Sequence, residues 1–324
     1  MFNPSFNKRI IHMAQQITNT VLMVRPAAFR MNEETAVNNY FQEDLQIKND
    51  EINKKAQTEF DAFVEKLRNK GVKVVIVEDK KEYDTPDSIF PNNWVSFHEN
   101  GTVVIYPMFA ENRRRERRME IFEQLESHGF KIEEILDYTS AEDEGIFLEG
   151  TGSIILDRVN QKAYCSLSAR ADEDLFIEFC EDMEFTPVIF TAFQDVDGKR
   201  KPIYHTNVMM CIGEEFAVIC LDSIDDSKEK KNVIRHLKED GKEIIRITEL
   251  QMHQFAGNML QVQGSGDKKY LVMSSTAHNS LDKQQVNTIE KYCEILSADI
   301  KTIETCGGGS TRCMMAEVFL PLKK

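Results

Sequence analysis

The sequence has no long apolar run and no excess of positive charge. Its longest apolar stretches, at residues 72–77 and 101–106, have the length of one β-strand, far below the roughly 20 residues of a membrane-spanning helix. The first residues include no apolar core of a signal peptide. The net charge is −14, with 54 acidic and 40 basic residues. We therefore expect no membrane and no nucleic acid as a partner, since both attract basic surfaces.

Cysteine and histidine lack the spacing of a disulfide framework or a metal site. The seven cysteines are an odd set without a Cys-x-x-Cys pair, and no histidine is spaced with them as a zinc ligand. We expect a reduced, cytoplasmic protein without a metal. Five cysteines fall in apolar patterns and are predicted to be buried as small hydrophobic residues. They are Cys165, Cys180, Cys211, Cys220 and Cys293.

One pattern recurs five times along the chain: an amphipathic helix, a short break and a β-rich run. In the first copy, Phe60, Phe63 and Leu67 have helical spacing, Gly71 is a typical helix stop, and residues 72–77 follow as a strand. In the last copy the pattern predicts a helix over 286–296 and a strand over 299–303. The breaks are 56–58 residues apart, at positions 71, 129, 185, 241 and 298.

Further strand-length apolar runs lie between each strand and the next helix, so each unit is predicted to be a ββαβ module. Units of this size bury their apolar faces by packing side by side. We expect an α/β fold with helices outside the sheets, formed by a single domain over residues 1–324. The period does not decide between an open arrangement and a closed ring of five.

The segment CGGGSTRC at 306–313 is the most unusual stretch of the sequence. Three consecutive glycines indicate positive φ angles or a close backbone approach, and no Lys-Ser/Thr follows them as in a phosphate-binding loop. Cys313, beside Arg312 and backbone N–H groups, is a candidate thiolate nucleophile. Cys306 is the competing thiol. On these residues alone, a glycine-rich hairpin with a buried cysteine is the favoured interpretation.

Two further residues suit a cysteine nucleophile, which needs a base and a group that orients the base. His205 lies at the entrance of an apolar strand, and Glu149 lies on a glycine-containing turn between two apolar runs. Each also has a plain structural interpretation. His205 would be a buried histidine with hydrogen-bonded ring nitrogens, and Glu149 would be a carboxylate that caps backbone N–H groups.

Three segments together resemble the catalytic blocks of one enzyme superfamily. FLEGTGS at 147–153, YHTN at 204–207 and CGGGSTRCMM at 306–315 are similar to blocks of the arginine deiminase, dimethylarginine dimethylaminohydrolase and amidinotransferase superfamily, whose fold is a five-bladed α/β propeller (pentein). FPNNW at 90–94 and SLSAR at 166–170 extend the resemblance, and FAGNML at 255–260 looks like the superfamily's apolar segment with a central Asn beside the site. The resemblance is strongest to bacterial amidinotransferase-like hydrolases of citrulline utilisation.

The resemblance implies roles for individual residues. Cys313 would be the nucleophile, His205 the general acid and base, and Glu149 the carboxylate that holds His205 or the substrate. Arg170 and Arg114 would be candidates for binding the substrate's α-carboxylate. No cofactor is implied. A homodimer is compatible with the resemblance, although no feature of the sequence itself indicates one.

The sequence departs from the superfamily where that superfamily binds a guanidinium group. Asn93 and Asn207 stand at positions where relatives have aspartate. A neutral amide both donates and accepts hydrogen bonds, so this exchange favours a neutral ureido group such as that of citrulline over a guanidinium cation. Asp87 is a second candidate for the missing acid and would restore a guanidine substrate.

The predicted function is therefore hydrolysis of a C–N bond in a guanidino or ureido group of an arginine-like small molecule, through a covalent cysteine intermediate. Transfer of the amidino group to an amine, and a binding protein that kept the fold without activity, are the alternatives. The expected partner is the arginine-like or citrulline-like substrate.

Overall fold

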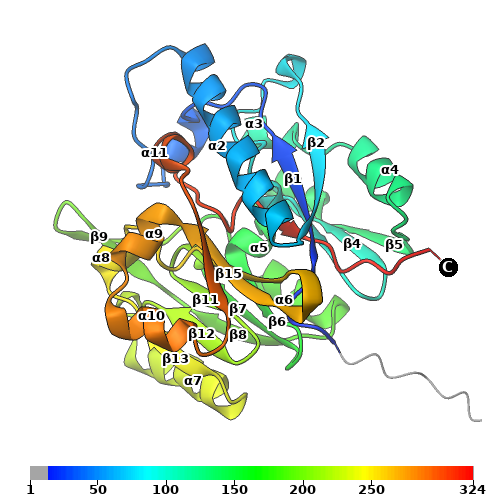
Figure 1. Cartoon of the computed structure of the whole chain (residues 1–324). Helices are drawn as coiled ribbons and strands as arrows, with labels where there is room; N and C mark the ends of the chain where they lie inside the picture. The colour runs from blue at the N-terminus through cyan, green and yellow to red at the C-terminus, as the bar shows by residue number, and fades with distance from the viewer. Residues whose placement is uncertain (1–13, 324) are drawn as a thin grey trace, which may run out of the picture.

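The computed structural model describes residues 14–323, in which short sheets are flanked by helices (Figure 1). The strands are β1 Thr20–Arg25, β2 Lys73–Glu78, β3 Val95–Phe97, β4 Thr102–Ile105, β5 Glu134–Asp137, β6 Ile154–Asp157, β7 Lys162–Ser166, β8 Thr186–Phe190, β9 Phe193–Val196, β10 Lys199–Pro202, β11 Met210–Ile212, β12 Phe216–Ile219, β13 Glu243–Arg246, β14 Leu260–Gln263, β15 Lys269–Ser274, β16 Glu294–Ala298 and β17 Ala316–Glu317. The helices are α1 Glu33–Ala36, α2 Asn49–Asn69, α3 Glu111–Arg114, α4 Glu120–Ser127, α5 Gly150–Ser153, α6 Glu173–Asp182, α7 Ser227–Glu239, α8 Glu249–Met252, α9 Ser275–Ser280, α10 Lys283–Ile289 and α11 Lys301–Gly307.

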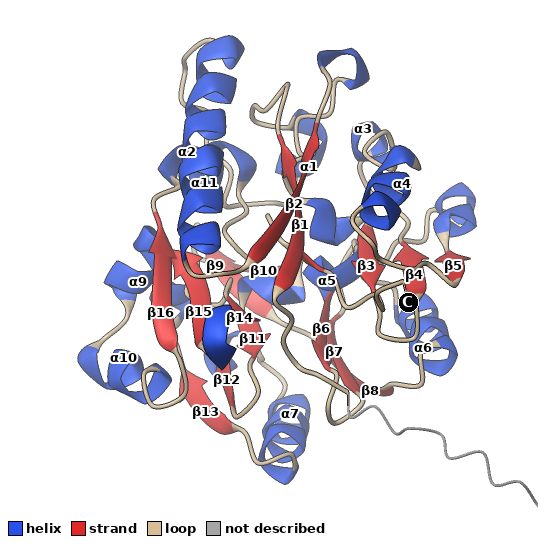
Figure 2. Ribbon diagram, turned by 45° about the vertical axis from the view of Figure 1, so that its right-hand side comes forward, coloured by secondary structure: helices blue, strands red, loops and turns tan. Residues whose placement is uncertain are grey.

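Within the described residues, five sheets have three strands, and each combines an antiparallel pair with a parallel pair. In one of them β4 pairs antiparallel with β3 and parallel with β5. The sheets β6-β7-β8, β11-β12-β13 and β14-β15-β16 repeat this arrangement. A parallel pair needs a crossover connection, and each crossover here contains a helix. Helices α2, α4, α6, α7 and α10 lie at the periphery in Figure 2. The predicted α/β class is confirmed.

The fifth sheet, β17-β1-β2, joins distant parts of the chain. β1 pairs parallel with β2, and the connection between them contains α2. The other edge of β1 pairs antiparallel with β17, with Val21 opposite Glu317. The segment that carries the glycine run is therefore anchored to the first strand.

The amphipathic helix α2 forms as its spacing predicts. Phe60, Phe63 and Leu67 are buried on one face, each contributing about 1.5–3 kcal/mol of hydrophobic free energy. Gly71 follows the helix with φ +84°, a conformation that glycine adopts without a Cβ penalty. The predicted helix-to-strand break at this position is confirmed.

The last repeat is shifted from its prediction. The helix α10 ends at Ile289, the strand β16 spans Glu294–Ala298, and residues 301–307 form helix α11 instead of a strand. Parallel pairing of β16 with β15 outweighs the helical spacing of Cys293 and Leu296. The local pattern did not contain this long-range pairing.

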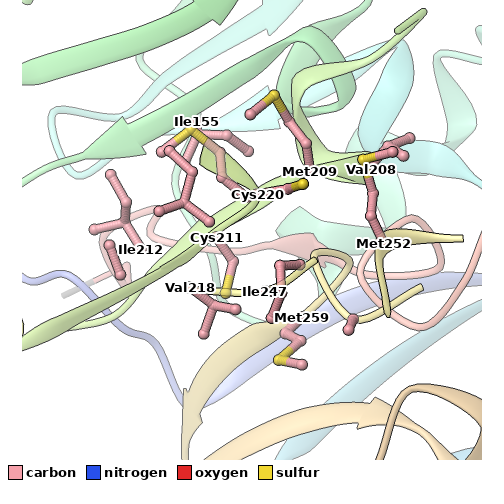
Figure 3. Close-up of a cluster of buried hydrophobic side chains, with 14 of the residues drawn as sticks. Ile155, Val208, Met209, Cys211, Ile212, Val218, Cys220, Ile247, Met252 and Met259 are labelled. Carbon is pink, nitrogen blue, oxygen red and sulfur yellow. The ribbon is translucent and has the colours of Figure 1, made fainter. Parts of the chain in front are cut away.

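Apolar side chains from several sheets interlock between the strands and the outer helices. Figure 3 shows part of the largest cluster, to which β6, β11 and β12 contribute. Cys211 lies in this cluster, where burial raises the pKa of its thiol to about 12. All five cysteines predicted to be structural are buried.

Five short segments carry the conspicuous polar residues, and each leads into the antiparallel edge strand of a sheet. The 3₁₀ turn before β3 contacts α5 before β6, and α5 contacts the 3₁₀ turn before β11. These segments are Pro91–Asn93, Gly150–Ser153, Thr206–Val208, residues 255–259 before β14 and residues 308–315 before β17. The repeat thus brings equivalent turns from distant parts of the sequence together.

No helix in residues 14–323 combines the length and the apolar character that crossing a membrane requires.

Candidate active site

A small polar cavity lies where these turns converge. Its lining comes from the turns, from the segment around α1, and from the loop before β3. The lining residues are Thr35, Asn39, Asp87, Phe90, Asn93, Arg113, Arg170, Tyr204, His205, Gly307, Gly308, Gly309 and Cys313.

The glycine run shapes the wall of the cavity beside Cys313. A Cβ atom on Gly307 or Gly309 would come within 2.7 or 2.9 Å of the Phe90 ring, which no substitution tolerates without a shift. Gly308 has φ +61°, and its carbonyl accepts a hydrogen bond from the Tyr204 hydroxyl at 2.7 Å. The glycines are thus explained by close approach to Phe90 and by one left-handed residue.

Cys313 lines the cavity, and its Sγ accepts hydrogen bonds from two amides. Asn258 Nδ2 lies 3.2 Å from the sulfur and Asn207 Nδ2 lies 3.4 Å from it. Cys306 is fully buried against the apolar cluster that includes α2, and burial raises the pKa of its thiol to about 11. Of the two thiols in the segment, Cys313 is the one that lines the cavity.

His205 and Glu149 form a buried pair. His205 Nε2 lies 2.7 Å from Glu149 Oε2, and Oε1 of the same carboxylate accepts a hydrogen bond from the Phe109 N–H at 3.0 Å. Burial opposes ionisation of Glu149, but Arg170 and the His205 hydrogen bond lower its pKa to about 2. Burial lowers the pKa of His205 to about 4, although the hydrogen bond to Glu149 and its charge raise this pKa. A neutral imidazole therefore donates to a carboxylate at neutral pH.

Gly152 lets this pair approach the backbone. A Cβ atom there would lie 2.3 Å from Asn93 Nδ2 and 2.9 Å from His205 Nδ1. The second glycine of the 149–153 turn is thus required by its two neighbours in the site.

Arg113 fixes the orientation of Asn93. It is buried and forms a bidentate pair with Glu116, at 2.9 and 3.0 Å, while its Nη1 donates to Asn93 Oδ1 at 2.8 Å. The donor end of the Asn93 amide, Nδ2, has no hydrogen-bond partner among the described residues. Asn93 thus keeps a free N–H donor at the cavity.

Asp87 lies beside this group. Its Oδ2 accepts hydrogen bonds from Asn32 at 2.7 Å and Thr35 at 3.2 Å, and Arg113 Nε lies 3.9 Å away. Burial raises the pKa of Asp87, opposed by the charge of Arg113. Asp87 Oδ1 has no partner within residues 14–323.

Arg170 also lines the cavity and holds the segment after β1 over it. It donates to the Asn38 side chain from Nε at 3.0 Å and to the Thr35 carbonyl from Nη2 at 3.0 Å. Its Nη1 lies 3.5 Å from Glu149, and its guanidinium lies 4.9 Å from the centre of the Tyr204 ring.

The structure does not bring Arg114 to the cavity. Its Nε donates to the Met108 carbonyl at 3.1 Å and lies 3.3 Å from Glu142. Successive residues of α3 point in directions about 100° apart, so Arg113 faces the site and Arg114 does not. The sequence named Arg114 as the candidate and did not identify the buried Arg113.

Two other expectations change. The Arg312 guanidinium turns away from the sulfur, donating to the Met315 carbonyl at 2.9 Å and to Glu317 at 2.8 Å. Asn258, which the resemblance of the segment 255–260 places beside the site without a role, contacts Cys313. Its position before β14, equivalent to that of Asn93 before β3, is the signal that identifies it. No group of three His, Cys, Asp or Glu side chains in residues 14–323 has the geometry to hold a metal ion.

A family model matches most of the chain. The family model described as "N,N dimethylarginine dimethylhydrolase, eukaryotic" matches residues 25–320. No curated protein matches the chain.

Solved structures share the fold at low sequence identity. ArgZ, an arginine dihydrolase from the ornithine-ammonia cycle in cyanobacteria, is 14% identical with a TM-score of 0.68. The match covers 94% of this chain and 41% of ArgZ, so the chain spans less than half of that protein. The N-terminal domain of an ArgZ variant, covalently bound to a reaction intermediate, is 15% identical with a TM-score of 0.68, over 93% of this chain and 99% of the domain.

A dimethylarginine dimethylaminohydrolase variant, in an adduct with S-methyl-L-thiocitrulline, is 16% identical with a TM-score of 0.59. That match covers 93% of this chain and 99% of the other.

Proposed function

Because the chain belongs to the N,N dimethylarginine dimethylhydrolase family, we propose that it is a cysteine hydrolase that cleaves a C–N bond in the ureido or guanidino group of an arginine-like amino acid. One observation carries the proposal: Cys313, the His205–Glu149 pair and Asn93 converge at one cavity. The relatives named an arginine dihydrolase and a dimethylarginine dimethylaminohydrolase support the reaction class.

The first half of the reaction forms a covalent intermediate. The neutral His205 imidazole takes up the thiol proton, and the Cys313 thiolate adds to the central carbon of the substrate group. His205 returns the proton to the departing nitrogen, the C–N bond breaks, and ammonia or an amine leaves. Glu149 stabilises the imidazolium while it exists, since its carboxylate is ionised.

The second half releases the enzyme. His205 accepts a proton from water as the water oxygen adds to the same carbon, and the C–S bond then breaks to regenerate the thiol. From a ureido substrate the intermediate is a thiocarbamate, and its hydrolysis gives a carbamate that loses CO₂ to leave an amine. From a guanidine the intermediate is a thiouronium, and its hydrolysis gives a urea.

A ureido group suits the polar atoms of the site better than a guanidinium. The ureido oxygen needs an N–H donor, and Asn93 Nδ2 is such a donor because Arg113 occupies Oδ1. A guanidinium offers only donors, which would face this N–H unfavourably. Asp87 favours a guanidinium instead, since its unpartnered oxygen suits a cation. The Asp87 carboxylate, however, already has protein partners: it accepts hydrogen bonds from Asn32 and Thr35 and lies near the charge of Arg113.

Arg170 is the proposed partner of the substrate α-carboxylate. Its Nε and Nη2 donate side by side to Asn38 and Thr35, an arrangement that a carboxylate accepts with two oxygens. Those two acceptors are neutral and a substrate carboxylate would replace them, whereas Arg113 is already paired with the carboxylate of Glu116. Arg114 lies elsewhere.

We also propose that the five three-stranded sheets are the blades of one closed propeller and that residues 1–324 form a single catalytic domain. The pairing of β1 with β17 supports closure, because it places both ends of the repeat in one sheet.

One experiment tests the function. The protein is incubated separately with citrulline, arginine, dimethylarginines and agmatine, with and without an amine acceptor, and products are followed by mass spectrometry beside Cys313→Ala. We expect citrulline to be converted, with a covalent adduct on Cys313 under quenching. Conversion of arginine but not citrulline would reject the ureido substrate. Products formed only with the acceptor would indicate a transferase, and no turnover with any compound would reject the enzyme.

A further inference from the structure

Two amide side chains surround the sulfur of Cys313. Asn258 and Asn207 come from turns 51 residues apart, and each points its Nδ2 at Sγ. Both asparagines are almost fully buried, at 1% and 0% exposed. Neither is needed by the acid–base steps that His205 and Glu149 perform.

The orientation of the Asn258 amide is fixed by its other contacts. Its Oδ1 accepts the Arg312 N–H at 3.0 Å, and its Nδ2 donates to the Asn207 carbonyl at 3.1 Å as well as to the sulfur. Exchanging oxygen and nitrogen would place a donor against the Arg312 N–H and an acceptor against the Asn207 carbonyl. The end that faces Sγ is therefore a donor.

Other donors near the sulfur are already engaged. The backbone N–H groups of Cys313, Met314 and Met315 donate to carbonyl groups within the same turn. The Arg312 side chain points to Glu317. Within the described residues, the two asparagines provide the hydrogen bonds that Sγ accepts.

We propose that Asn258, assisted by Asn207, is a catalytic residue that stabilises the Cys313 thiolate by donating N–H hydrogen bonds directly to the sulfur. The inference rests on the proposed function, and it explains a requirement of a neutral substrate. A guanidinium cation bound beside a cysteine itself favours the thiolate, whereas a ureido group brings no charge. The protein then has to supply the stabilisation, and N–H donors held in place before the substrate binds do so without reorganisation.

The same donors act twice in the cycle. Sulfur carries negative charge when the thiolate attacks, and again when the C–S bond breaks after water has added. An aspartate at either position would place a carboxylate against that charge at both moments. The two amides thus stabilise the sulfur at both steps.

The test measures the thiolate without any substrate. Thiolate absorbance near 240 nm is followed from pH 5 to 10 as the difference between each protein and its Cys313→Ser counterpart, and carbamidomethylation of Cys313 by iodoacetamide is timed by mass spectrometry. Asn258→Ala and Asn258→Asp are compared with wild type. Gln261→Ala is the matched control, since Gln261 is a buried amide on the same segment that accepts the Glu214 N–H and does not contact Cys313.

We expect Asn258→Ala to lower the thiolate fraction at a given subsaturating pH by about tenfold, the effect of losing one hydrogen bond to a charged group. Asn258→Asp, which preserves the side-chain shape, should lower it further, and Gln261→Ala should leave it unchanged. A wild-type profile in both Asn258 variants would overturn the inference. If one variant does not fold, the other decides.

Failure of this inference and failure of the proposed function give different results. Shifted thiolate profiles in a protein that converts no ureido or guanidino compound would keep the thiolate role and reject the hydrolase. Normal profiles in an active enzyme would reject the role of Asn258 and keep the hydrolase.

Discussion

Arg113 donates to the side-chain oxygen of Asn93 over 2.8 Å, and this one bond decides which end of the Asn93 amide is left for a ligand. Glu116 in turn holds Arg113 with two hydrogen bonds. A residue that does not itself need to contact the substrate thus sets the hydrogen-bonding character of the cavity.

Asn93→Asp should reverse the preference between ureido and guanidino substrates. The new carboxylate retains the contact with Arg113 but loses the N–H donor, and its free oxygen accepts hydrogen bonds from a guanidinium. We expect kcat/KM for citrulline to fall by about tenfold to a hundredfold, the cost of one or two unpaired polar contacts. The ratio of kcat/KM for citrulline and arginine measures the effect. Asn100→Asp is the control, because Asn100 is exposed on the turn between β3 and β4 and its Oδ1 accepts the Thr102 N–H, as an aspartate oxygen would. An unchanged ratio in Asn93→Asp would contradict the role of Asn93.

The buried His205 should make stability depend on pH between about 4 and 6.5. Its pKa is lowered to about 4 in the folded protein, so in this range the unfolded chain binds a proton that the folded protein does not. Its contribution is fully present above about pH 6.5 and is lost as the pH falls towards 4, by about 3 kcal/mol at most.

Urea unfolding of wild type and His205→Gln at several pH values tests this. Glutamine does not titrate and still donates to Glu149, so the variant should show a flatter slope in that window. His128→Gln, at an exposed position, should retain the wild-type slope. Parallel curves for His205→Gln and wild type would count against a neutral His205.

Gly152→Ala should damage the site far more than the fold. The added Cβ would meet Asn93 Nδ2 at 2.3 Å and His205 Nδ1 at 2.9 Å, so both side chains must move. We expect kcat to fall by at least about a hundredfold, with a loss of about 1–3 kcal/mol in the free energy of unfolding.

Gly129→Ala provides the comparison for Gly152→Ala. Gly129 has φ +89°, and nothing lies within 4 Å of its added Cβ. It should cost about 1 kcal/mol of backbone strain and leave kcat unchanged. Equal losses of activity in both variants would show a general effect of destabilisation.

Cys306→Ala should retain activity, whereas Cys313→Ala should abolish it. Cys306 packs in an apolar cluster, and burial raises the pKa of its thiol to about 11. We expect alkylation by a haloacetamidine to mark Cys313 in the Cys306→Ala variant at the wild-type rate. Turnover by Cys313→Ala would assign the reaction to another nucleophile.

The sequence predicted those parts of the fold that depend on local pattern. The apolar spacing of α2 and its stop at Gly71 are encoded within a few neighbouring residues, and both are confirmed. The strand β16 was misplaced because its pairing with β15 competes with helical spacing and is not visible locally.

In the candidate site, too, residues marked by local sequence were predicted and those that depend on long-range contacts were not. Cys313, His205 and Glu149 were found because each lies in a short segment of unusual composition, and all three lie at or beside the cavity. The sequence named Arg114, whereas Arg113 lies at the cavity. This difference depends on the rotation of the four-residue helix α3. The resemblance of its segment places Asn258 beside the site, but only the assembled turns show that it contacts the sulfur.

The antiparallel pairing of β1 with β17 affects when during folding the surroundings of Cys313 form. Val21 and Glu317 are separated by almost the whole described chain, and contacts of such separation form slowly because a long loop must first be closed. The turn with Cys313 directly precedes β17. The Cys313 sulfur therefore acquires Asn207 and Asn258 as neighbours only after parts of the described chain that are far apart in sequence have come together, so we expect its surroundings to form late in folding.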